Sequence, residues 1–181
     1  MPRANRYIVS GQIYHLTHRC HDRSFLFRFA KDRNVYRTML RDRLEQYPIS
    51  CLGYCITSNH THLLVRVNGV ATNVLGRFMQ VLEGEFAQYY NRRKQRSGAF
   101  WSDRYHAVMI DSGEYVWRCL RYIDLNMVRA GAVRTPAEWA WCGYQEIAGL
   151  RKRYRLIDQD ALLSALAPGR TRSQVVTRSE E

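Results

Sequence analysis

The chain has 181 residues, a formal net charge of +12 and 46% hydrophobic residues. That length suits one domain with a full core, and no apolar run approaches the ~20 residues that span a bilayer. The first residues, MPRANRYIVSG, lack the apolar stretch of a signal peptide, so we expect a cytoplasmic protein. The positive charge favours a polyanionic partner, most often nucleic acid, over a membrane surface.

The apolar pattern alternates along the chain between a period of two and a spacing of three to four. Pro48 ends the first helical stretch, and Ser58-Asn59 suits a hairpin turn between two strands. Residues 168–181 are basic with few apolar side chains, so we expect a disordered tail after a single domain at 1–167. The predicted elements, in chain order, are a strand at 12–18, a helix at 30–47, strands at 49–57 and 61–67, a helix at 72–93, a strand at 105–110, and helices at 112–130 and 158–166.

The order β-α-β-β-α-β is that of the ferredoxin-like sandwich. We therefore expect an α+β fold with one antiparallel sheet and helices on one face. The helix at 112–130 follows the last of these strands, so it is an additional C-terminal helix outside the basic motif. Because this fold supports many activities, the function has to be argued from the site.

The cysteines argue against two kinds of stabilising site. Their number is odd and no two of them form a CxxC pair, so neither a disulfide framework nor a cysteine zinc site is expected. They are better interpreted as small buried hydrophobic residues in a reducing compartment. The five are Cys20, Cys51, Cys55, Cys119 and Cys142.

A pair of histidines one residue apart is the most informative local feature of the chain. His60 and His62 lie in a strand-like run, and a side-chain period of two places both on one face, with Thr61 on the other. Two imidazoles at that spacing can share one metal ion. Two polar side chains on a solvated face would give the same pattern.

The helix predicted at 112–130 has a polar flank beside its apolar stripe. Tyr122 and Asn126 lie one turn apart on that flank, and Tyr115 falls beside them, so spacing alone does not choose between the two tyrosines. Two histidines, an amide and a tyrosine are the parts of a metal-assisted site with a tyrosine nucleophile. An amide oxygen favours a hard ion such as Mg²⁺ or Mn²⁺ over structural Zn²⁺. The apolar stripe, expected to dock on the body, is Val116, Leu120, Ile123 and Met127.

Five short motifs span most of residues 10–131. They are YHLTHRC at 14–20, SNHTHLLV at 58–65, YYNRR at 89–93, SGAFWSDRY at 97–105 and LRYIDLNMVRAG at 120–131. In this order and spacing, the chain resembles the HUH single-tyrosine transposases and, within them, the REP-associated tyrosine transposases.

The resemblance implies roles for four residues. His60 and His62 would bind the metal, Asn126 would complete the metal site, and Tyr122 on the C-terminal helix would be the nucleophile. Two positions depart from the family pattern, because Thr61 replaces a bulky apolar residue and Met127 replaces a proline. Neither departure removes a functional group, although Met127 could lengthen or straighten the end of the helix.

The resemblance also implies the chemistry and the partner. Tyr122 would attack a phosphate of single-stranded DNA at REP-type hairpins, leaving a 3′-hydroxyl and a 5′-phosphotyrosine, and the strands could rejoin without ATP. The protein could act as a monomer or a homodimer. Arginine groups would hold the DNA backbone, and Phe100 and Trp101 could stack on bases or be buried. The predicted DNA-binding residues are Arg92, Arg93, Lys94, Arg96, Arg104, Arg118, Arg121 and Arg129.

Three other functions compete with this one. An RNA-recognition-like binding module explains the charge and the fold but gives the histidine pair no role. A non-catalytic hairpin-binding relative is disfavoured because all four site residues are present. A 2H-type phosphoesterase needs two His-x-Thr/Ser motifs, and only His15-Leu16-Thr17 fits. A zinc cluster near residue 18 is disfavoured, because on a strand His15 points away from His18 and Cys20.

Overall fold

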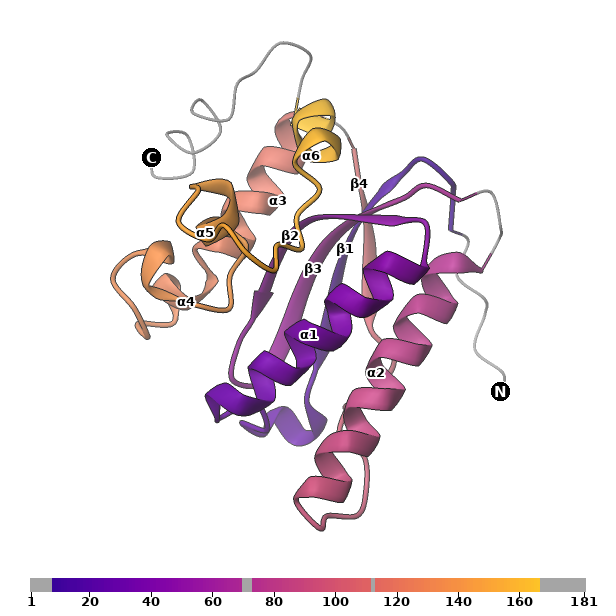
Figure 1. The fold of residues 1–181 in the computed structure, drawn as a ribbon, viewed down its shortest axis with the longest axis vertical. Helices are drawn as coiled ribbons and strands as arrows, with labels where there is room; N and C mark the ends of the chain where they lie inside the picture. The colour runs from indigo at the N-terminus through magenta and orange to yellow at the C-terminus, as the bar shows by residue number, and fades with distance from the viewer. Residues whose placement is uncertain (1–7, 70–72, 112, 167–181) are drawn as a thin grey trace.

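The computed structural model describes residues 8–69, 73–111 and 113–166 (Figure 1). The predicted tail at 168–181 lies outside these residues. No helix in the described part is both long and apolar enough to cross a membrane. The strands are β1 (Ile13–Arg19), β2 (Ile49–Ile56), β3 (His60–Val67) and β4 (His106–Ile110). The helices are α1 (Ala30–Gln46), α2 (Val74–Arg93), α3 (Glu114–Asp124), α4 (Asn126–Arg129), α5 (Tyr144–Ile147) and α6 (Gln159–Leu166), with 3₁₀ turns η1 (His21–Arg23) and η2 (Pro136–Glu138).

The four strands form one antiparallel sheet in the order β2-β3-β1-β4. Each strand lies within one residue of its predicted bounds. The hairpin between β2 and β3 closes where it was predicted, with the N–H of Thr57 donating to the carbonyl of His60 at 2.9 Å. The α+β, ferredoxin-like prediction is therefore confirmed.

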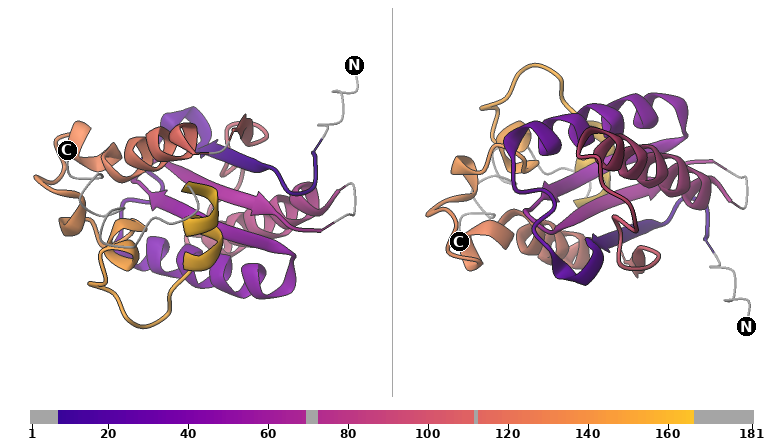
Figure 2. Two further views of the ribbon diagram at one scale, coloured as in Figure 1. Left: turned by 90° about the horizontal axis from the view of Figure 1, so that it is seen from above. Right: turned by 90° about the horizontal axis from the view of Figure 1, so that it is seen from below.

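Helices α1 and α2 cover one face of the sheet, and α3 covers the other (Figure 2). The side chains of β3 alternate between these two layers. Thr61 lies on the α1 side, where it is buried and hydrogen bonds to Tyr36. His60 and His62 lie on the side of α3. An apolar stripe of α2 is buried against the sheet, where each side chain contributes about 1.5–3 kcal/mol by leaving water. Its fully buried members are Leu75, Phe78, Met79, Leu82 and Phe86.

Helix α3 docks on β2 through the predicted stripe, in which Val116, Leu120 and Ile123 are buried. Gly53 makes the close approach possible, because a Cβ atom there would stand 2.7 Å from Leu120 Cδ1. The docking buries one flank of α3 and brings its polar flank to the edge of the histidine pair.

The helix predicted to run without interruption from 112 to 130 is instead two helices. Leu125, between α3 and α4, has a ψ of 4°, well away from the helical value near −42°. Its N–H still donates to the carbonyl of Arg121, and its own carbonyl accepts from the N–H of Arg129. The interruption is therefore a local distortion across which these two helical hydrogen bonds persist. Met127 in place of proline does not give one continuous helix.

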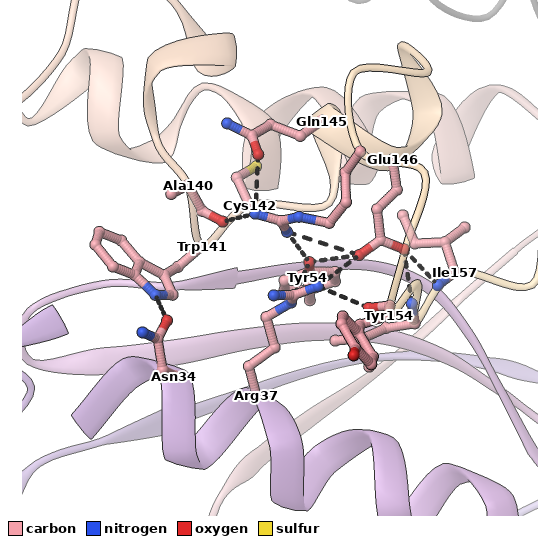
Figure 3. Close-up of polar contacts among 12 residues, drawn as sticks. Asn34, Arg37, Tyr54, Ala140, Trp141, Cys142, Gln145, Glu146, Tyr154 and Ile157 are labelled. Carbon is pink, nitrogen blue, oxygen red and sulfur yellow. Dashed lines mark hydrogen bonds and ion pairs between the residues drawn. The ribbon is translucent and has the colours of Figure 1, made fainter. Parts of the chain in front are cut away.

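The irregular segment after α4 covers β2, which would otherwise be an open edge of the sheet. Glu146, fully buried, anchors it by accepting hydrogen bonds from the Tyr54 hydroxyl at 2.6 Å and from the N–H groups of Leu156 and Ile157 at 2.7 and 2.9 Å (Figure 3). The guanidinium groups of Arg37 and Arg151 lie 3.9 Å from the same carboxylate. The buried charge is thus both paired and hydrogen-bonded.

Candidate functional site

The pairing of β1 with β3 builds the floor of the site. Thr17 is opposite His62 and Arg19 is opposite His60 in this antiparallel pair, so side chains from both strands share the face towards α3. The two histidines converge there, with 2.9 Å between His60 Nε2 and His62 Nε2. The prediction that they project from one face of a strand is confirmed.

His60 is oriented by the hairpin that precedes it. Its Nδ1 lies 2.6 Å from Asn59 Oδ1 and 2.9 Å from Thr57 Oγ1. The amide of Asn59 is itself oriented, because its Nδ2 donates to the carbonyl of Arg23. Asn59 Oδ1 can only accept, so His60 carries its proton on Nδ1 and presents the lone pair of Nε2 to the site.

His62 has different neighbours, which the sequence did not reveal as part of the site. Its Nδ1 lies 2.9 Å from His15 Nε2 and 3.2 Å from Thr17 Oγ1, both on β1. Their two-residue spacing was a visible signal that His15 and Thr17 share a face. The register of β1 against β3, which the sequence did not supply, decides that they contact His62.

Helices α3 and α4 bring the other two predicted residues to the histidines. Asn126 Nδ2 lies 3.1 Å from His62 Nε2. The ring of Tyr122 stands edge-on to His62, with 5.6 Å between the ring centroids, and close to His15 at 6.0 Å. Tyr122 is 46% exposed, so it lies beside the histidines and remains open to a large partner.

Arg129 covers the tyrosine ring from the other side. Its guanidinium carbon lies 4.4 Å from the centroid of the Tyr122 ring, and it also donates a hydrogen bond to the Tyr122 carbonyl. Tyr115, the other candidate nucleophile, is 60% exposed, and its ring is contacted by Arg118 at 6.0 Å. Of the two tyrosines, Tyr122 is the one whose ring packs against the imidazoles.

Burial is the main cause of the lowered imidazole pKa values at the site. It lowers the pKa of His60 to about 4, assisted by the charge of Arg19. It lowers the pKa of His62 to about 2, assisted by the neighbouring His60 and His15. The pKa of His15 is also lowered by burial. All three imidazoles are therefore neutral near pH 7, the form that binds metal ions.

The spacing of the two imidazole nitrogens fits an octahedral divalent cation. Two adjacent ligands of an octahedral ion at ~2.1 Å stand about 3.0 Å apart, close to the 2.9 Å between the two Nε2 atoms. Asn126 would supply Oδ1 after a half-turn of its amide. Within residues 8–69, 73–111 and 113–166, no group of three His, Cys, Asp or Glu side chains could hold a metal. A site there would therefore need the amide as its third protein ligand.

The zinc cluster considered near residue 18 is not assembled. His18 lies on the opposite face of the sheet from His15, where it stacks on Trp101 and bonds to the carbonyl of Asp103. Phe100 is buried, and Trp101 donates from its indole to the carbonyl of Glu83. Of the two roles that the sequence left open, the structure gives Phe100 the buried one, whereas Trp101 packs on the core while only partly buried.

The predicted DNA-binding residues fall into two groups. At the end of α2, Arg93 forms an ion pair with the buried Asp32, and Arg96 bonds to Asn91 and to the carbonyl of Ala99, so both have structural partners. Arg92 and Lys94 are exposed on the same helix end. Near the site, Arg121 is exposed and Arg129 covers Tyr122.

A groove of about 710 Å³ runs beside Tyr122 between β1, β4 and α3. Arg104 and Arg118, both predicted, line it together with Tyr115. Arg19 also lines it and was missed by the sequence prediction, because nothing local distinguishes it from other strand-end arginines. The groove thus presents three guanidinium groups next to the tyrosine and the histidines.

Known proteins are similar to this chain in both sequence and fold. The family described as "Transposase IS200 like" matches residues 8–126. A curated protein of Haemophilus influenzae named "Putative REP-associated tyrosine transposase" is 27% identical over 154 residues, covering 80% of this chain and 86% of that protein. A solved structure described as "Structure of the REP associates tyrosine transposase bound to a REP hairpin" superposes with a TM-score of 0.66 at 17% identity, over 84% of this chain and 89% of that one.

These matches confirm the resemblance indicated by the five motifs. The identity to the solved structure is low, so that likeness supports the fold alone. The family match covers well over half of the chain and includes β1, β3 and α3, which carry the candidate site. The chain therefore belongs to the IS200-like transposase family.

Proposed function

We propose that this protein is a metal-dependent, single-stranded DNA transposase that cleaves and rejoins DNA at REP-type hairpins through a 5′-phosphotyrosine intermediate. The observation that carries the proposal is the convergence of His60 Nε2, His62 Nε2 and the Asn126 amide beside the exposed ring of Tyr122. Family membership and the names of the similar proteins support REP-type hairpins as the substrate.

Each part of the site has a role in this chemistry. The Tyr122 oxygen attacks phosphorus, a Tyr–O–P bond forms, and the P–O3′ bond breaks to leave a 3′-hydroxyl. Held by His60, His62 and Asn126, a divalent ion would supply Lewis-acid polarisation of the scissile phosphate. The guanidinium of Arg129 lies over the Tyr122 ring, where its positive charge would favour the tyrosinate form. The reverse reaction uses the same groups to rejoin the strand.

The groove beside Tyr122 suits the single strand that leads to the cleaved bond. Arg19, Arg104 and Arg118 can contact its phosphates, which predicts binding that weakens steeply with salt. Tyr115, exposed on the same wall, can stack on a base. In contrast, a 2H-type phosphoesterase has no support from this arrangement, because His15 and Thr17 contact His62 instead of facing a second His-x-Thr motif.

The test is covalent trapping on a denaturing gel. A labelled single-stranded REP-type hairpin is incubated with wild type, Tyr122→Phe and Tyr115→Phe in Mg²⁺, Mn²⁺ or EDTA. We expect an adduct with wild type and Tyr115→Phe in either metal, and none with Tyr122→Phe or in EDTA. Tyr115 is the matched control because it lies on the same helix and in the same groove.

Two outcomes would contradict the proposal. An adduct that persists in Tyr122→Phe and disappears in Tyr115→Phe would transfer the nucleophile role to Tyr115. Tight hairpin binding without any adduct would indicate a hairpin-binding protein that does not cleave. Binding is measured separately, by fluorescence anisotropy, so that a poor substrate is not mistaken for an inactive protein.

A further inference from the structure

We propose that His15 is a positioning residue for the metal site, whose Nε2 accepts the Nδ1 proton of His62 and so keeps the lone pair of His62 Nε2 aimed at the ion. This inference rests on the proposed metal site. It assigns a role on β1 to a residue outside the set formed by His60, His62, Tyr122 and Asn126.

The argument begins with a difference between the two converging histidines. His60 donates from Nδ1 to Asn59 Oδ1, an atom that can only accept, so its tautomer is determined before any ion arrives. The Nδ1 of His62 contacts an imidazole and a hydroxyl, each of which can donate or accept. Within the described residues, no carboxylate or carbonyl oxygen is bonded to His62. The tautomer of His62 therefore depends on whether His15 and Thr17 donate to its Nδ1 or accept from it.

Metal binding selects one tautomer of His62. Without an ion, a proton on His62 Nε2 would bridge the 2.9 Å contact between the two Nε2 atoms, with the Asn126 amide turned so that its oxygen faces that proton. With an ion, both Nε2 atoms need free lone pairs, so the proton of His62 must be on Nδ1. An acceptor must then face Nδ1, as is usual for metal-bound histidines.

His15 is better placed than Thr17 to be that acceptor. Its Nε2 is the nearer atom, at 2.9 Å against 3.2 Å for the hydroxyl. The two imidazoles also stack, with planes 22° apart and centroids 5.1 Å apart, which limits rotation of the His62 ring. His15 is not itself placed as a ligand, because it faces the Nδ1 side of His62 while the ion would lie on the Nε2 side.

The experiment measures metal binding by the full chain without DNA. Mn²⁺ is titrated into wild type, His15→Leu and His15→Gln, and free Mn²⁺ is followed by electron paramagnetic resonance. We expect affinity to fall about 10- to 100-fold in His15→Leu, the usual effect of losing such an outer partner. His15→Gln should restore most of it, because its amide oxygen can accept from Nδ1. His21→Leu, which alters a histidine paired with Asp22 away from the site, is the matched control.

Nitrogen-15 NMR of the histidine rings gives a second readout that does not depend on activity. In Mg²⁺, wild-type His62 should be protonated on Nδ1, and His15→Leu should show a mixture of tautomers. Unchanged Mn²⁺ affinity in His15→Leu would overturn the inference. Equal losses in His15→Leu and His15→Gln would also overturn it, because they would indicate packing alone. A wild type that binds no Mn²⁺ would instead refute the proposed metal site, and the tautomer of His62 would still test its bond to His15.

Discussion

Glu146 and His62 are both buried polar groups at which distant segments of the chain meet, and their surroundings are opposite. Around Glu146, a hydroxyl and two backbone N–H groups donate to the carboxylate, and two guanidinium groups lie nearby. Around His62, two further imidazoles and an amide converge, and no carboxylate among the described residues is bonded to it. The first cluster has a donor for each buried acceptor and a paired charge, whereas the second brings neutral nitrogen atoms together without a charged partner among the described residues.

This difference separates a structural cluster from a candidate working site. A buried charge with all its hydrogen bonds made holds the surrounding segments in place and has no free acceptor for a ligand. Converging neutral imidazoles can instead turn their lone pairs towards a cation. Substitutions in the first cluster should therefore reduce stability, and substitutions in the second should reduce activity with little loss of stability.

The largest effect is expected from Glu146→Ala. It leaves Arg37 and Arg151, both mostly buried, without their counter-charge, and it removes the acceptor for Tyr54. The free energy of unfolding should fall by about 3–5 kcal/mol, as measured in urea at pH 7. Glu85→Ala, which breaks only the exposed pair with Arg43, should cost less than about 1 kcal/mol. If Glu146→Ala and Glu85→Ala lost the same unfolding free energy, the buried Glu146 cluster would contribute no more to stability than an ordinary surface ion pair.

The complementary change is His60→Ala. It removes one of the two converging imidazoles, so the rate of adduct formation should fall at least about 100-fold, or ~2.7 kcal/mol in the barrier. The free energy of unfolding should change by less than about 1 kcal/mol, because His60 is only partly buried and its loss leaves no charge without a partner. The covalent trapping assay measures the expected loss of activity, and urea unfolding of the same variant measures the expected small change in stability. A stability loss as large as that of Glu146→Ala would show that the two clusters do not differ in kind.

Asp124, beneath the site on α3, should make stability depend on pH. Burial raises its pKa to about 7, and a hydrogen bond from Cys142 Sγ only partly offsets this. Because the folded pKa lies above the unfolded value near 4, the folded state favours the protonated form. Stability is greatest below about pH 4 from this group and is lost as the pH rises through 7.

Between pH 5 and pH 7 the loss from Asp124 should be about 2–3 kcal/mol. Asp124→Asn keeps the shape without the charge, so the difference in unfolding free energy between the variant and wild type should grow across this range and level off above it. A difference that is constant with pH would refute the assignment.

The smallest effects concern the glycine that lets α3 approach β2. Gly53→Ala places a methyl group 2.7 Å from the buried Leu120, which should cost about 1–2 kcal/mol and shift Tyr122 relative to His62. Because Tyr122 moves relative to His62, the rate of adduct formation should also fall in Gly53→Ala. Gly84→Ala, in the middle of α2 with open space around it, should instead add up to ~1 kcal/mol of stability and leave activity unchanged. Thermal unfolding and the trapping assay distinguish the two.

The strands and the long helices were predictable because their periodicity is local. Alternation in β1 and β3 and the stripes of α2 and α3 are set by which side chains leave water, and each appears where the sequence placed it. The irregular anchor around Glu146 was not predictable. Its partners lie 92 residues away at Tyr54 and 10–11 residues away in a loop without periodicity.

The sequence by itself determined that His60 and His62 share a face, because that follows from the geometry of a single strand. It also placed Tyr122 and Asn126 four residues apart, and the hydrogen bonds that persist across Leu125 keep them on one side. Only the tertiary structure decided that His15 contacts His62, that Tyr122 lies nearer the imidazoles than Tyr115 does, and that Arg93 and Arg96 have structural partners. Those outcomes depend on strand register and on how α3 docks against Gly53. Register and docking are set by long-range packing, which no short stretch of sequence encodes.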